Sequence, residues 1–74
     1  MNFREFWVVE CDGCFCALEA EDGEEILFQV RSRQSPSVFR TKAAAERAIT
    51  RSMKYAEQHN YSWTAGRAIR FSRG

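Results

Sequence analysis

The fold is decided by residues 3–20, which read Phe3-Arg-Glu-Phe-Trp-Val-Val-Glu-Cys-Asp-Gly-Cys-Phe-Cys-Ala-Leu-Glu-Ala20. The Asp12-Gly13 pair between two runs of strand formers predicts a hairpin with a two-residue type I′ loop. Both central positions of that loop need a positive φ, which Gly adopts freely and Asp tolerates. We therefore expect two antiparallel strands in which Cys11 lies opposite Cys14, Trp7 opposite Leu18 and Phe6 opposite Glu19.

A second Asp-Gly pair, at Asp22-Gly23, leads into a run of strand formers over residues 25–31 and predicts a third strand. With two-residue loops at both turns, one face of the sheet carries Phe6, Val8, Phe15, Ala17, Ile26, Phe28 and Val30. We expect this face to form the core, while a bulge at Gly23 would exchange the two faces. The other face carries Phe3, Trp7, Val9, Cys11, Cys14, Cys16 and Leu18, and it is then available for a homodimer.

One helix is predicted over residues 42–58. Thr41 is a good N-cap, because its hydroxyl can accept a hydrogen bond from a free backbone N–H of the first turn. Helical spacing predicts a buried stripe of Ala45, Ala48, Ile49, Ser52, Met53 and Ala56. The exposed face is mainly positive, with Lys42, Glu46, Arg47, Arg51 and Lys54. His59-Asn60 predicts the end of the helix, since Asn can adopt a left-handed conformation.

Residues 32–40 read as a loop, and residues 67–73 alternate enough to predict a fourth strand with Ile69 and Phe71 pointing inward. The 74 residues allow one domain. The fold class is therefore α+β: an antiparallel sheet of three or four strands with one helix packed on one face, in the order β-β-β-α-β.

The chain has no run of about 20 apolar residues, the length that a membrane span needs. Its first residues lack the basic and apolar regions of a signal peptide, so we expect a cytoplasmic protein with no membrane partner. Such a compartment keeps cysteines reduced.

The two halves of the chain carry opposite charge. Through Val30 there are eight acidic residues against Arg4 alone, whereas from Arg31 onward there are ten basic and two acidic residues. The formal net charge of +1 hides this division. Folding decides whether the halves neutralise each other or present two oppositely charged surfaces.

Cys11, Cys14, Cys16 and His59 contain the residue types of a structural zinc site. Cys16, however, follows Cys14 by two strand positions, about 7 Å, which is too far along for the same tetrahedron. The alternatives are a disulfide between Cys11 and Cys14 or three thiols that pack as small hydrophobic groups, and we favour the thiols. Because no nucleophile–base pair or phosphate-binding loop is recognisable either, we expect a protein without cofactor, metal or enzymatic activity.

An acidic cluster surrounds the second Asp-Gly turn. Carboxylates this close together repel one another and cost stability unless a basic surface lies against them. That surface is either internal, with Arg67 and Arg70 as candidates, or belongs to a partner protein. The candidate partner-binding residues are Glu19, Glu21, Asp22, Glu24 and Glu25.

Three strands followed by Phe39, Thr41, Lys42 and Ala45 at a helix start resemble, over residues 3–56, the arm-binding domains of phage-type integrases. This resemblance implies that the sheet lies in a DNA groove. The acidic strands oppose that placement, because phosphate contacts need positive charge. Contact with nucleic acid would instead come from the candidates Arg47, Arg51, Lys54, Arg67, Arg70 and Arg73.

In size, in its lack of motifs and in its acidic edge, the chain resembles the small proteins of phages and mobile elements, including the anti-CRISPR proteins. The resemblance implies a stoichiometric inhibitor in the cytoplasm of a bacterial host cell. Its acidic residues would block a basic nucleic-acid-binding surface, for example on a subunit of a CRISPR effector. Our expectation is therefore a non-enzymatic protein-binding module. The alternative is a nucleic-acid-binding domain that uses the basic helix and the C-terminal arginines.

Overall fold

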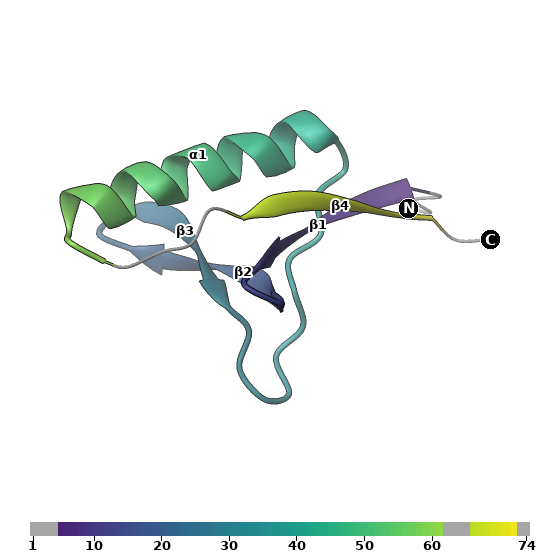
Figure 1. The fold of residues 1–74 in the computed structure, drawn as a ribbon, viewed down its shortest axis with the longest axis horizontal. Coiled ribbons are helices and arrows are strands. Elements are labelled where there is room, and N and C mark those ends of the chain that lie inside the picture. Colours follow the sequence, from purple (N-terminus) through teal and green to yellow (C-terminus); the bar gives the residue numbers. More distant parts are fainter. Residues whose placement is uncertain (1–4, 62–65, 73–74) are drawn as a thin grey trace.

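The computed structural model of this chain describes residues 5–61 and 66–72. Its four strands form one antiparallel sheet in the order β3-β2-β1-β4, and the single helix α1 lies across one face of it (Figure 1). The α+β class and the order β-β-β-α-β are thereby confirmed. The elements are β1 (Glu5–Cys11), β2 (Cys14–Glu21), β3 (Glu24–Gln29), α1 (Lys42–Gln58) and β4 (Arg67–Ser72).

Both Asp-Gly pairs form the two-residue loops that the sequence predicts. The backbone φ angles are 54° at Asp12 and 80° at Gly13, and 50° at Asp22 and 79° at Gly23. Two positive φ angles in succession define a type I′ turn, whose twist matches that of the flanking strands. The loops place Cys11 opposite Cys14 and Glu21 opposite Glu24, so the register of β3 has no bulge.

The helix has the predicted bounds and caps. The Thr41 hydroxyl accepts a hydrogen bond from the Ala44 N–H at 3.0 Å, and Asn60 beyond the C-terminus has a φ of 56°. The predicted stripe is wrong at one position, because Met53 is 44% exposed while Tyr55 is buried. With 3.6 residues per turn, the positions that follow Ser52 on the buried face are three and four residues later, at Tyr55 and Ala56.

The helix covers the opposite face of the sheet from the one that we expected to form the core, although Val8, Ala17 and Ile26 of the expected face are also buried. The helix covers the face with Trp7 and Val9, so this face is not available for a homodimer either. The side-chain sizes help to explain the choice: Ala45 and Ala48 bring the helix close to the sheet over the fully buried Val9 and Cys16, whereas the other face carries four phenylalanines. The core and its flanking residues are Trp7, Val9, Cys11, Cys16, Leu18, Leu27, Phe39, Ala45, Ala48, Ile49 and Ala68.

A short extended segment separates β1 from β2 along most of their length. These strands pair only at Glu10–Phe15 and Cys11–Cys14. Beyond that point Trp7 exchanges two backbone hydrogen bonds of 2.8 Å with Phe39, and the Ser37 N–H donates to the Cys16 carbonyl. The predicted pairs Trp7–Leu18 and Phe6–Glu19 are therefore wrong. Residues 37–39, in the segment predicted as a loop, supply backbone partners to both strands.

Helix side chains satisfy the outer edge of β3. The Ser52 hydroxyl accepts a hydrogen bond from the Leu27 N–H at 2.9 Å and donates to the Ala48 carbonyl at 2.7 Å. The Arg51 Nε donates to the Glu25 carbonyl at 2.7 Å. An edge strand normally exposes such groups as a template for another chain, so these contacts both attach the helix and close the edge.

We expect Ser52→Ala to lower the free energy of unfolding by about 1–3 kcal/mol, because the buried Leu27 N–H would lose its only described acceptor. Urea denaturation of this variant and of Thr50→Ala measures the effect. Thr50 is exposed on the same helix and provides the control, which should change little. Equal effects of the two substitutions would contradict a structural role for the Ser52 hydroxyl.

Candidate functional site

The acidic cluster lies at the turn between β2 and β3. Glu21 and Glu24 are exposed and stand directly opposite each other on either side of the Asp22-Gly23 loop. Like charges in directly opposed strand positions destabilise a hairpin. Glu25 is exposed beside them, whereas Glu19 lies opposite Ile26 and is half-buried. The structure thus gathers Glu21, Asp22, Glu24 and Glu25 at one tip, which we call the acidic turn, and places Glu19 at its base.

Tyr55 holds the acidic turn against the end of the helix. Its ring is buried, and its hydroxyl donates a hydrogen bond of 3.0 Å to the Asp22 carboxylate. The ring also stacks on His59, with 4.1 Å between the centroids. Burial, and then the hydrogen bond to Asp22, raise the pKa of the Tyr55 hydroxyl to about 12. The sequence analysis did not single out Tyr55, although its spacing from Ser52 could have indicated it.

The raised pKa of Tyr55 predicts a loss of stability at alkaline pH. The pKa is above the ordinary value of 10.0, so the stabilising contribution is complete below pH 10 and is lost as the pH rises from 10 through about 12. Tyr55→Phe should make the free energy of unfolding less dependent on pH in this window. Urea titrations of both proteins at several pH values measure the slope, and an equal slope in both would contradict the assignment.

No internal base among the described residues forms an ion pair with the acidic turn, although three basic residues of the helix line a groove together with Glu24. Arg67 pairs with Glu10 at 3.2 Å and Arg70 with Glu5 at 3.6 Å, both between β1 and β4. Among the described residues, Glu21, Glu24 and Glu25 have no ion pair within 4.0 Å. Of the two sources proposed for a compensating basic surface, the internal one at Arg67 and Arg70 is therefore engaged elsewhere.

The candidate nucleic-acid-binding residues fall on two elements. Arg47, Arg51 and Lys54 follow one another at helical spacing and line a shallow groove on the outer side of α1, together with Glu24 and Glu46. Arg67 and Arg70 lie on β4, and Arg73 lies outside the described residues. The helix therefore brings three of the six together, in a groove that also contains two carboxylates.

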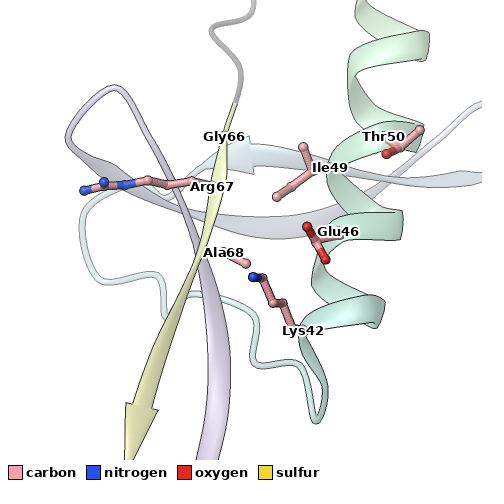
Figure 2. A pocket seen from close by; sticks show the side chains of 7 residues that line it. All are labelled: Lys42, Glu46, Ile49, Thr50, Gly66, Arg67 and Ala68. Carbon is pink, nitrogen blue, oxygen red and sulfur yellow. The ribbon is translucent and has the colours of Figure 1, made fainter.

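A second groove, with a volume of about 350 Å³, lies between α1 and β4. Figure 2 shows Lys42 and Glu46 on the helix side of this groove, while the Arg67 side chain extends away from the helix. Ile49 and Ala68 supply apolar walls, and the Lys42 ammonium also lies 5.9 Å from the centre of the Trp7 ring. One ammonium and one carboxylate beside apolar walls are typical of a surface groove between packed elements. We therefore do not assign a function to this groove.

The three cysteines all lie in the described part of the chain and form no disulfide with one another. Cys16 is fully buried, and burial, followed by the neighbouring Cys11, raises its pKa to about 12. Cys14 is exposed at the tip of the first hairpin. Over residues 5–61 and 66–72, no group of three or more His, Cys, Asp or Glu side chains is arranged to hold a metal ion.

Comparison with protein-family models, with curated proteins and with solved structures gives no match. In the part of the chain that the structure describes, no helix combines the length and the apolar character that crossing a bilayer requires. The functional argument therefore rests on the geometry of the acidic turn and of the surfaces around it.

Proposed function

We propose that this chain is a non-enzymatic protein-binding module whose acidic turn binds a basic surface of a partner protein. The observation that carries this proposal is the like-charge pair Glu21–Glu24, which forms no ion pair with the described residues and remains exposed on a turn that Tyr55 and Arg51 hold in place. A fixed cluster of like charges lowers the stability of the unbound domain. A partner surface of opposite charge relieves this repulsion. Its rigidity lowers the entropy that is lost when the partner binds.

The more specific form of the proposal is an inhibitor of the anti-CRISPR type. Basic surfaces that bind nucleic acid recognise closely spaced negative charges. Exposed carboxylates on a rigid hairpin tip present such charges without being a nucleic acid. The module would then occupy the basic nucleic-acid-binding surface of a host defence complex and compete with its DNA or RNA.

Nucleic-acid binding through the helix is the second candidate function. It is favoured by the alignment of Arg47, Arg51 and Lys54 along one groove. Glu24 and Glu46 line the same groove and oppose phosphate there. The two functions make opposite demands on charge, and variants can therefore separate them.

Affinity capture from bacterial lysate with the tagged domain, with and without nuclease, tests the proposal. We expect a partner protein that is retained after nuclease treatment. Glu21→Lys/Glu24→Lys should abolish its capture, whereas Arg47→Glu/Lys54→Glu should leave it intact and serves as the matched control on the helix.

The nucleic-acid alternative predicts the converse. Recovery would vanish with nuclease, and it would be lost in the helix variant but not in the variant of the acidic turn. That result would overturn the proposed function. Circular dichroism of each variant establishes that its fold is unchanged.

A further inference from the structure

The face of the sheet away from α1 carries a cluster of aromatic side chains. The strand register puts Phe6 opposite Phe71, and their rings stack at 5.5 Å, while Phe15 meets Phe71 edge-on at 5.9 Å. Phe28 on β3 lies opposite Ala17 and so belongs to the same face. We call this surface the aromatic face; it comprises Phe6, Phe15, Phe28, Val30, Ile69 and Phe71.

None of the described helices or strands covers the aromatic face. Phe15 is 36% exposed, and its aromatic neighbours are half-buried above Val8 and Ala17, which are buried. The side chains of the aromatic face are therefore partly exposed and adjacent to one another, so they form one continuous apolar surface. Contiguous apolar patches of this kind on a soluble domain mark interaction surfaces.

Opposite charges flank the two ends of this face. The acidic turn precedes β3, and a loop with the exposed residues Arg31 and Arg33 follows it, about 20 Å away along the six-residue strand. This loop is fixed by hydrogen bonds in both directions between Arg31 and Gln34. Figure 1 shows the loop projecting from the sheet on the side away from α1, where it can reach a molecule on the aromatic face.

We propose that the aromatic face binds a second copy of this chain, with the two sheets packed face to face around a two-fold axis. The axis runs across the strands, so that the Arg31–Arg33 loop of each copy lies over the acidic turn of the other. A two-fold axis along the strands would instead place the acidic turns of the two copies against each other, and likewise the two basic loops. Charge repulsion disfavours that arrangement.

The size of the face shows why the charged ends are needed. Four strands about 4.8 Å apart and about six residues long present roughly 400 Å², whereas a standard interface buries about 800 Å² on each partner. The projecting loop and the acidic turn supply additional contact at both ends. Formation of the dimer does not require the partner proposed above, but both use the acidic turn, so the basic loop of the second copy and the partner compete for it.

Sedimentation equilibrium over a range of protein concentrations tests the dimer. We expect reversible dimerisation of the native chain and a loss of affinity of at least about tenfold for Phe15→Ser. The charge reversals Glu21→Arg/Glu24→Arg and Arg31→Glu/Arg33→Glu should each weaken the dimer similarly. Their combination should restore it, because the attraction between the ends is then re-formed with exchanged signs.

A chain that stays monomeric at every concentration would overturn the proposal, and so would a dimer that Phe15→Ser leaves unchanged. A combined reversal that dimerises no better than the single ones would overturn the crossed arrangement. Phe15→Ser also separates this inference from the proposed function, because it should weaken dimerisation without changing any residue of the acidic turn, so the variant should still capture the partner protein.

Discussion

Leu27→Ala should lower the free energy of unfolding by about 2–5 kcal/mol, the largest effect on stability that we predict for one substitution. Leu27 is 1% exposed in the core between β3 and α1, and its N–H is held by Ser52. A domain of 74 residues has a total stability of only about 4–11 kcal/mol. We therefore expect this substitution to remove a large fraction of the total stability, which thermal and urea denaturation can measure.

Met53→Ala is the matched control, because the position lies on the helix but is 44% exposed. It should change the free energy of unfolding by less than about 0.5 kcal/mol. The pair also tests the orientation of the helix: if α1 buried the stripe that includes Met53, this substitution would be the costly one. A large loss for Met53→Ala with a small loss for Leu27→Ala would contradict the core described above.

Glu21→Lys should have opposite effects on stability and on binding. It replaces the like-charge pair Glu21–Glu24 with an attractive pair, so we expect a gain in stability of about 0.2–1 kcal/mol. It also removes a charge that the proposed partner recognises, and the affinity for the captured partner should fall by at least about tenfold. Urea denaturation and a binding titration on the same preparation measure the two effects.

Glu57→Lys provides the control for this prediction, since it makes the same change of charge at an exposed position on the helix. It should leave the affinity within a few fold of the native value. An equal loss of affinity from both substitutions would mean that net charge, and not the acidic turn, determines binding. A stabilised Glu21→Lys variant that still binds fully would contradict the proposed function.

Local signals in the sequence were sufficient for the elements and their order. Two Asp-Gly pairs require positive φ angles that few residues adopt, and Thr41 and Asn60 mark the ends of the helix by their capping chemistry. These signals act within a few residues. No such local signal shows which face of the sheet the helix covers. Both faces are apolar, and the covered face is determined by how closely α1 can approach it.

Contacts between distant residues account for what the sequence analysis missed. The insertion of Ser37 and Phe39 between β1 and β2 depends on hydrogen bonds across more than 20 residues, for which the local pattern gives no signal. The acidic turn itself was predictable from composition and spacing. Its attachment through Tyr55 was not, because a tyrosine on a helix can lie on either face and only the fold brings it to Asp22.

Mapping the contact on the isotope-labelled domain tests whether the acidic turn is the surface that binds the partner protein. In a ¹H–¹⁵N NMR titration with the captured partner, we expect the largest changes at the amides of residues 19–25, and these changes should weaken with added salt. Changes that are confined instead to the outer side of α1, around Arg47, Arg51 and Lys54, would contradict the account and assign binding to the basic helix.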